Sequence, residues 1–230
     1  MTAPNPLETL TAVPPFYLGR QPILDRDGHT VAYELLFRPD RQNGVVVTDD
    51  RAATASVIAH AFTDLGIQSV LGERDGLINF DAELLLSDIP ELLPAARIVI
   101  EILETVVFTP EIMARCRDLK QQGFRLALDD VSQFEQLAPE VLELIDIVKV
   151  DLRAISMYQL PKLAKAAKAA RVTLLAEKVE SLFLADRCRE LGFDLFQGYY
   201  FARPMLLEGR RSQPDRHLLL QLLQQVANDT

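Results

Sequence analysis

Six short apolar segments of the chain each run into polar or charged residues that a strand interior does not normally carry. The segments read GLINFD, RIVIEILE, RLALDD, DIVKVD, VTLLAEKV and DLFQGY. Their polar residues are Asn79, Glu101, Asp129, Asp130, Lys149, Glu177 and Gln197. If the segments are successive parallel strands, these residues converge at the carboxyl ends, where a parallel barrel keeps its chemistry. Because four carboxylates so close together repel one another, the set predicts a divalent metal site.

The elements that would position these residues follow an alternating order. Helix-like stretches separate the six segments, which predicts βα units and a parallel sheet. Upstream, FYLGRQPIL and TVAYELLFR flank DRDGH, and a DG turn between β-rich runs predicts an antiparallel hairpin over 17–24 and 30–37. With these two strands the count is eight, which predicts a TIM-like (β/α)8 barrel with an antiparallel first pairing. A doubly wound open sheet is the alternative, but no glycine-rich phosphate loop follows any strand.

The segments that flank the predicted strands differ in character. Residues 1–15 contain four prolines without periodicity and are expected to form an N-terminal arm. An alanine-rich stretch over 51–65 predicts a helix that ends at Gly66. Residues 206–230 begin as a linker and continue as HLLLQLLQQVAND, which has one apolar helical face. That helix either packs on the barrel or opens a second domain.

Composition limits the classes of partner. The formal net charge is -9, which argues against non-specific binding to nucleic acid or to an anionic membrane. A signal peptide and an apolar run long enough to span a membrane are both missing from the sequence. Cys116 and Cys188 lie in helix-like segments and are expected to be ordinary thiols of a cytoplasmic protein. The three histidines show no metal-ligand spacing.

Several of the polar residues allow two interpretations. Glu101 stands between isoleucines and must be paired or ligated, whereas Glu104 is expected in a surface loop. Asp129 and Asp130 can reach one site only if a turn separates them, because adjacent strand residues point to opposite faces. The alternative for Asp130 is a helix cap. Lys149 is either the structural partner of a carboxylate or a catalytic cation.

Four further residues belong to the same set of candidates. Glu34 lies in the apolar run YELLFR, and Arg38 at its end could bind a phosphate in bidentate fashion. Asn79 and Gln197 would alternatively satisfy backbone groups, but such residues recur at the end of strand after strand.

The order of these motifs resembles that of the EAL domain family, a barrel that hydrolyses the bacterial second messenger cyclic di-GMP. The resemblance covers residues 16–205. YELLFR is similar to the namesake EAL-x-R segment, and IEILE matches the E-x-x-E segment. LINFD, LALDD and VKVD match the asparagine, paired-aspartate and lysine strands, and AEKVES is similar to an AEGVE-type segment. RQPILD resembles the QPI segment, and QGYYFARP is very close to the QGY-F-x-P ending.

The resemblance implies a role for each matched residue. Two divalent ions, Mg²⁺ or Mn²⁺, would be bound by Glu34, Asn79, Glu101, Asp129, Asp130 and Glu177, with Asp130 on the second ion. Lys149 would orient the attacking water, with Glu34 and Glu177 also counted as catalytic. The nucleotide would be bound by Gln21, Arg38, Asp151, Gln197 and Pro204. The implied product is the linear dinucleotide pGpG.

Three departures from the family pattern accompany this resemblance. The family's DDFGTGYSSL loop is replaced by DDVSQFEQL, which lacks both glycines and is one residue shorter before Lys149. The namesake alanine is Leu35, which is expected to add bulk beside Glu34, and the glycine of the AEGVE-type segment is Lys178. The pattern looks like the subgroup in which an EAL domain precedes an HDOD domain. A catalytically degenerate EAL domain that acts as a nucleotide-binding or protein-interaction module is the alternative to an enzyme.

Overall fold

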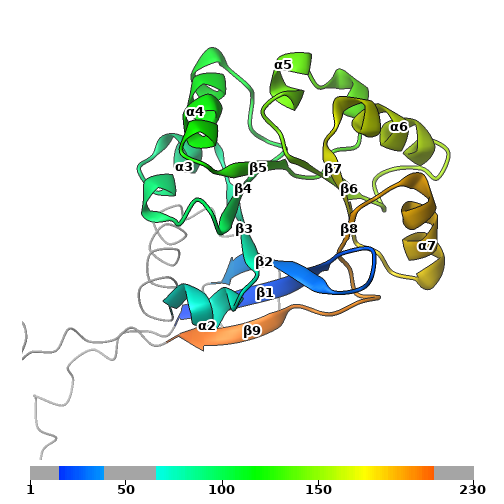
Figure 1. Ribbon diagram of the computed structural model, residues 1–230, viewed down its shortest axis with the longest axis horizontal. Helices are drawn as coiled ribbons and strands as arrows, with labels where there is room; N and C mark the ends of the chain where they lie inside the picture. Colours follow the sequence, from blue (N-terminus) through cyan, green and yellow to red (C-terminus); the bar gives the residue numbers. More distant parts are fainter. Residues whose placement is uncertain (1–15, 39–65, 210–230) are drawn as a thin grey trace, which may run out of the picture.

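The computed structural model describes residues 16–38 and 66–209, which form a closed barrel ringed by helices (Figure 1). Eight strands build the barrel wall. In chain order they are β1 (Phe16–Leu24), β2 (Thr30–Arg38), β3 (Asp75–Phe80), β4 (Ile98–Ile102), β5 (Arg125–Leu128), β6 (Ile147–Asp151), β7 (Thr173–Glu177) and β8 (Leu195–Phe196). Strands β2 to β8 run parallel in sequence order, so the predicted TIM-like barrel is confirmed.

The barrel closes through β1, which is antiparallel to both of its neighbours. β1 pairs with β2 over most of its length, and Leu24 at its end pairs with Phe196 of β8. The turn between β1 and β2 contains Gly28 at φ +85, as the DG pattern predicts. The hairpin expected over 17–24 and 30–37 is therefore present, and it supplies the antiparallel first pairing.

Helices cover the outer face of the wall. They are α2 (Ile67–Leu71), α3 (Ala82–Leu86), η2 (Pro90–Leu92), α4 (Pro110–Gln121), η3 (Phe134–Gln136), α5 (Pro139–Leu142), α6 (Leu160–Ala170) and α7 (Leu182–Leu191). Side chains cap three of them: Asp81, Thr109 and Ser181 accept hydrogen bonds from the backbone N–H groups of Leu84, Ile112 and Leu184. Such caps satisfy N–H groups that the first helical turn leaves without a partner.

Two segments differ from the sequence-based expectations. The segment predicted as a long last strand is extended over only Leu195–Phe196, because the chain turns at Gly198. The linker expected from residue 206 begins instead within β9 (Met205–Gly209), which pairs antiparallel with the first half of β1. Backbone pairing with the uncovered half of β1 accounts for this strand. The predicted arm over 1–15, helix over 51–65 and segment 210–230 lie outside the described residues.

The core has two layers, one inside the barrel and one between the wall and the helices. The inner layer is small and consists of Ile23, Ala32, Leu77, Val99, Ala127, Ile147 and Leu175. The outer layer is larger and includes Ile100 of β4, Leu126 of β5 and Cys116 of α4. Alternate residues of each strand therefore face opposite layers, which fixes the direction of the side chains within the strands.

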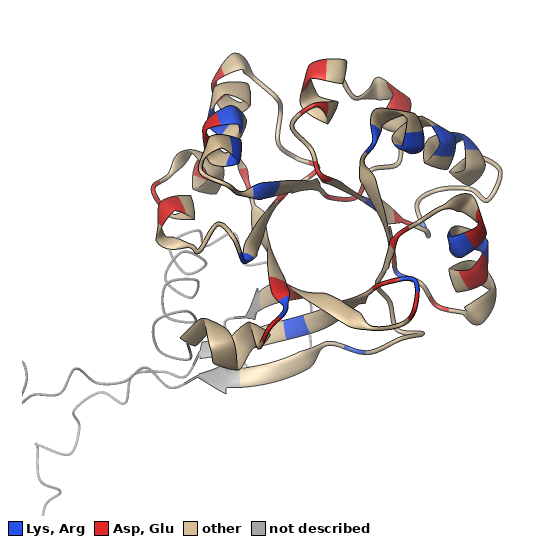
Figure 2. Ribbon diagram, in the orientation of Figure 1, with Lys and Arg blue, Asp and Glu red and all other residues tan. Residues whose placement is uncertain are grey.

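Charged residues lie mainly on the surrounding helices and loops, and the barrel strands carry few (Figure 2). Within the described part of the chain, no helix has the length and apolar character needed to cross a membrane.

The first prediction concerns Gly198, where a Cβ atom would lie 2.2 Å from the backbone oxygen of Val179. Because the obstacle is backbone, side-chain movement cannot relieve it. Gly198→Ala should lower the free energy of unfolding by about 3 kcal/mol or more, measured by urea denaturation. Gly192→Ala is the matched control, since Gly192 has φ +93 but open space around it, and should cost about 1–2 kcal/mol. Equal losses in the two variants would contradict the steric explanation.

The second prediction concerns the two thiols, which are free, as expected; the structure also shows that both are fully buried. Burial raises the pKa of Cys116 to about 11 and that of Cys188 to about 12. A raised pKa keeps the thiol protonated, and thiolate is the reactive form. The folded chain should therefore not react with Ellman's reagent at pH 8, whereas the unfolded chain should release two equivalents. Because unfolded thiols ionise near pH 9, stability should fall as the pH rises from there toward 12.

Candidate functional site

The ammonium of Lys149 stands at the centre of four carboxylates that come from four different strands or strand ends. Its Nζ lies 3.0 Å from Asp129 Oδ1, 2.9 Å from Glu177 Oε1 and 3.6 Å from Glu34 Oε1. It also forms an ion pair with Glu101. Lys149 is 1% exposed and Glu101 is 0% exposed. The structure therefore brings together four of the six predicted metal ligands around the predicted lysine.

Strand alternation explains why these side chains converge. Each polar residue stands two positions after a member of the apolar inner layer, so both face the barrel interior. The pairs are Ala32 and Glu34, Leu77 and Asn79, Val99 and Glu101, Ala127 and Asp129, Ile147 and Lys149, and Leu175 and Glu177. The apolar layer forms the floor and the polar layer lies above it, at the carboxyl ends of the parallel strands. Each polar group thus has an apolar side chain directly beneath it. Because these apolar side chains exclude water, the polar groups lie in a region of low dielectric constant.

One ammonium cannot neutralise four carboxylates, and the pKa values reflect this imbalance. Burial, together with the charges of Glu34, Asp129 and Glu177, raises the pKa of Glu101 well above its usual value despite its contact with Lys149. Burial also raises the pKa of Glu177 to about 7. Although burial opposes it, the four carboxylates raise the pKa of Lys149 well above its usual value, so this lysine stays charged. Lys149 therefore balances the charge of only one of the four carboxyl groups that surround it.

Burial also acts to raise the pKa of Asp129, but Lys149 outweighs it and lowers that pKa below its usual value. Lys149 therefore stabilises Asp129 in its charged form.

Oxygen atoms without partners lie beside this charge. Among the described residues, Asn79 Oδ1, Glu101 Oε2 and Gln197 Oε1 are buried and accept no hydrogen bond. Unpaired buried oxygens are costly, and carboxylate and amide oxygens are the ligands that Mg²⁺ and Mn²⁺ prefer. The residues present thus fit a divalent metal ion, with Glu34, Asn79, Glu101, Asp129 and Glu177 as its candidate ligands.

Gln197 links the end of the barrel wall back to its beginning. Its Nε2 donates to Glu34 Oε2 at 2.6 Å, which holds the Glu34 carboxylate toward Lys149. The position of Gln197 depends on the turn that follows, where Val179 N donates to Gln197 O at 3.0 Å. Gln21 is the register partner of Glu34 across the β1–β2 pairing. Gln197 is therefore a positioning residue for Glu34.

Asp129 and Asp130 do diverge through a turn, as their adjacency requires. Asp130 has a left-handed backbone with φ 46, and its carboxylate turns away from Lys149 toward a second lysine. Lys178 Nζ lies 3.4 Å from Asp130 Oδ1 and 2.5 Å from Asp151 Oδ2. The interpretation of Asp130 as a helix cap is wrong, because the next helix, η3, has no side-chain cap. The sequence drew attention to Lys178 only as a departure from a pattern.

The remaining sequence-predicted residues occupy the edges of the site. Leu35 is buried in the outer layer, so the expectation that it crowds Glu34 is wrong: successive strand residues point to opposite faces. Glu104 is exposed, and its carboxylate can lie within 4.8 Å of those of Asp129 and Asp130. Pro204 directly precedes β9 and is half-buried. The side chain of Arg38 lies outside the described part of the chain.

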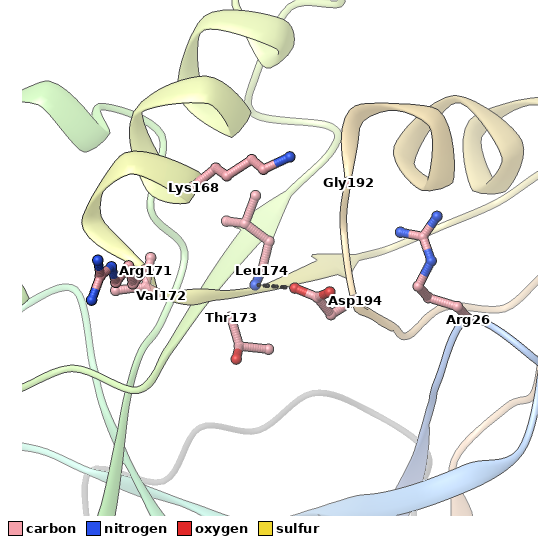
Figure 3. A pocket seen from close by; sticks show the side chains of 8 residues that line it. All are labelled: Arg26, Lys168, Arg171, Val172, Thr173, Leu174, Gly192 and Asp194. Carbon is pink, nitrogen blue, oxygen red and sulfur yellow. Dashed lines mark hydrogen bonds between the residues drawn. The ribbon is translucent and has the colours of Figure 1, made fainter.

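A hollow lies at the opposite end of the barrel and is not part of this site. It has a volume of about 520 Å³ and is lined by Arg26, Lys168, Arg171, Val172, Thr173, Leu174, Gly192 and Asp194 (Figure 3). These residues belong to the carboxyl ends of α6 and α7, to the amino ends of the strands β7 and β8 that follow them, and to the β1–β2 turn. Arg26 already donates to the backbone oxygens of Phe193 and Arg189. In such barrels the active site lies at the carboxyl ends of the strands, which is the end that carries the Lys149 cluster.

The third prediction tests the role of Lys149 as the counterion of the cluster. Lys149→Met should lower the free energy of unfolding by about 3–5 kcal/mol in the presence of a chelator, because it leaves three buried carboxylates and the half-buried Asp129 without their cation. Urea denaturation measures this loss, and added Mn²⁺ should recover part of it. Lys162→Met is the control, since the Lys162 side chain is 77% exposed and pairs with Glu135 on the surface. A Lys149→Met variant as stable as the wild type would contradict the assigned role.

Curated relatives were found by comparison of the whole sequence. The chain is 34% identical over 213 residues to the cyclic di-GMP phosphodiesterase CdgJ of Vibrio cholerae, covering 91% of this chain and 49% of that protein. It is 31% identical over 217 residues to the uncharacterized protein YuxH of Bacillus subtilis, covering 93% of this chain and 53% of that protein. The chain thus spans about half the length of these curated relatives.

Solved structures share the fold. The Klebsiella pneumoniae protein BlrP1, in a complex with manganese and cyclic di-GMP, superposes with a TM-score of 0.69 at 23% identity, over 86% of this chain and 58% of that one. Bacillus subtilis YkuI, in a complex with cyclic di-GMP and calcium, gives 0.66 at 21% identity, over 99% and 65%. The sequence profile described as EAL domain matches residues 14–204. With its motifs in order on a closed barrel of the same fold, the chain belongs to the EAL domain family.

Proposed function

We propose that this chain binds cyclic di-GMP and hydrolyses one of its phosphodiester bonds to give linear pGpG. The observation that carries the proposal is the cluster of four carboxylates around Lys149, three of them buried and that of Asp129 half-buried, with unpaired oxygens of Asn79 and Glu101 beside it. Membership of the EAL domain family and the name of the Vibrio cholerae relative supply the substrate. An acidic chain can hold an anionic nucleotide in this way, because a metal-bound phosphate needs no basic surface.

We propose Mg²⁺ or Mn²⁺ as the metal, held by Glu34, Asn79, Glu101, Asp129 and Glu177. When bound, the metal supplies a water of lowered pKa and neutralises charge on the phosphate. Lys149 would orient the attacking water through its ammonium, which is fixed by its four carboxylate partners. Gln197 would keep Glu34 in place, since its amide donates to that carboxylate. The floor of apolar residues would exclude other water from the site.

The nucleotide would lie across the open end of the barrel. We propose that Gln21 and Pro204 contact it directly, with Arg38 as a phosphate ligand, as the family resemblance implies. Asp151 is held by Lys178, and Gln197 is held by Glu34. Their contacts with the nucleotide would therefore use atoms that those bonds leave available, such as the unpaired Oε1 of Gln197.

The second candidate function is a nucleotide-binding or protein-interaction module without turnover. Two observations favour it. The carboxylate of Asp130, which the resemblance assigns to a second metal ion, is paired with Lys178. The loop after Asp130 also lacks the two family glycines and forms the short helix η3 instead.

We further propose that residues 1–15 form an arm, that 16–205 form the EAL domain, and that the segment from about 206 leads into an HDOD domain. The share of the relatives' length that the chain covers, about half in each case, supports a longer protein. We infer a cytoplasmic location, and the two free buried thiols support it.

The fourth prediction tests turnover. The purified chain incubated with cyclic di-GMP and Mn²⁺ or Mg²⁺ should release pGpG, followed by ion-pair chromatography. Glu34→Ala should lower the rate by about 10²-fold or more, because it removes both a metal ligand and a partner of Lys149. Glu140→Ala is the matched control: Glu140 is an exposed carboxylate on α5, and its removal should leave the rate unchanged.

The same samples separate the two candidate functions. Intact nucleotide that binds in calorimetry without any product would reject the enzyme and favour the module. Product at an equal rate in Glu34→Ala would show that the activity does not arise at this site.

A further inference from the structure

Lys178 occupies a position at which the family carries glycine, and it reaches across the end of the barrel. It directly follows β7 and has a left-handed backbone with φ 55. From there its ammonium extends past β6 to Asp130, the residue after Asp129 at the end of β5. On the way it bonds Asp151, the last residue of β6. A side chain thus spans three neighbouring strands from a conformation that glycine adopts more easily.

The two lysines divide the acidic residues of the site between them. Lys149 contacts four carboxylates, so three formal negative charges remain when all are ionised. Lys178 contacts two, so only one remains, and Arg153 Nε lies 3.6 Å from Asp151 Oδ1 as well. Electrostatic attraction therefore draws a divalent cation to the carboxylates around Lys149. The attraction to Asp130 and Asp151, which Lys178 contacts, is weaker.

A second ion would need the carboxylate that Lys178 holds. The oxygens available to it beside the Lys149 cluster are those of Glu104, Asp129 and Asp130, which lie within 4.8 Å of one another. Asp129 is already paired with Lys149 and Asp130 with Lys178. Binding would have to displace one ammonium or tolerate its repulsion at close range.

We propose that Lys178 is a built-in cation that takes the place of a second metal ion, so that the wild-type chain binds one divalent ion and not two. The inference rests on the proposed metal-dependent function. It makes Lys178 the residue that determines metal stoichiometry: the single ion lies on the Lys149 side, and removal of the Lys178 ammonium opens a second position at Asp130 and Glu104.

The fifth prediction is a count of bound Mn²⁺, which requires no turnover. The chain is stripped with a chelator and titrated with MnCl₂, and free Mn²⁺ is followed by electron paramagnetic resonance at room temperature. Wild type should bind one ion per chain, and Lys178→Gly should bind two. Lys178→Asn should also bind two ions, because it removes the charge and asparagine tolerates the left-handed backbone. This variant replaces Lys178→Gly in the experiment if the glycine variant folds poorly. Lys178→Arg keeps the charge and should bind one.

Arg171→Gly is the matched control. Arg171 is also a cation with a left-handed backbone, φ 60, but it caps α6 at the amino-end side of the barrel. Its replacement relieves the same strain and removes the same charge, and should leave one ion bound. A second ion in this variant would show that the change in Lys178→Gly comes from backbone relief or net charge.

The outcomes separate this inference from the proposed function. Two ions in wild type, or one in both Lys178→Gly and Lys178→Asn, would overturn the role of Lys178 while leaving the metal site intact. Absence of Mn²⁺ binding in wild type and in every variant would overturn the proposed function itself, and the inference with it.

Discussion

The placement of one buried ammonium among four carboxylates, three of them buried, is the constraint on which the rest of this structure depends. Glu34, Glu101, Asp129 and Glu177 approach Lys149 from four directions, and removal of any charge from water is expensive unless it is paired. A barrel meets this constraint because its strands are rigid and its closure fixes which residues face inward. The fold thus holds together a set of charges that would otherwise separate, and the resulting excess of negative charge is what a metal ion would relieve.

Closure of the barrel is itself tied to the site. β1 runs antiparallel between β2 and β8, and the hydrogen bond from Gln197 to Glu34 joins the last strand to the second one across this gap. Gln197 is in turn held by the close approach of Gly198 to Val179. Stability and chemistry are therefore not separate at this end of the molecule, because the turn that completes the wall also orients a candidate metal ligand.

Much of this arrangement could be predicted from the sequence, and the reason is physical. Glu101 and Lys149 stand inside apolar runs, where a charge has few explanations other than a partner or a ligand. Period-two alternation then places each on the inner face. What could not be predicted depends on tertiary contacts: the brevity of β8 follows from a backbone approach at Gly198, and β9 exists because half of β1 offers an unpaired edge. The crowding expected from Leu35 was wrong because its side chain faces the outer layer.

How strongly a departure from the family pattern affects the site depends on the direction in which the new side chain points. Leu35 replaces a small residue, yet it adds its bulk to the packing between wall and helices and leaves the site unchanged. Lys178 replaces a glycine at the end of a strand, where no alternation rule applies and a left-handed backbone sends the side chain inward. The residue types alone do not show which of these two replacements affects the site more. The geometry does, because a permanent positive charge 3.4 Å from Asp130 alters what that carboxylate can bind, whereas an apolar group in an apolar layer does not.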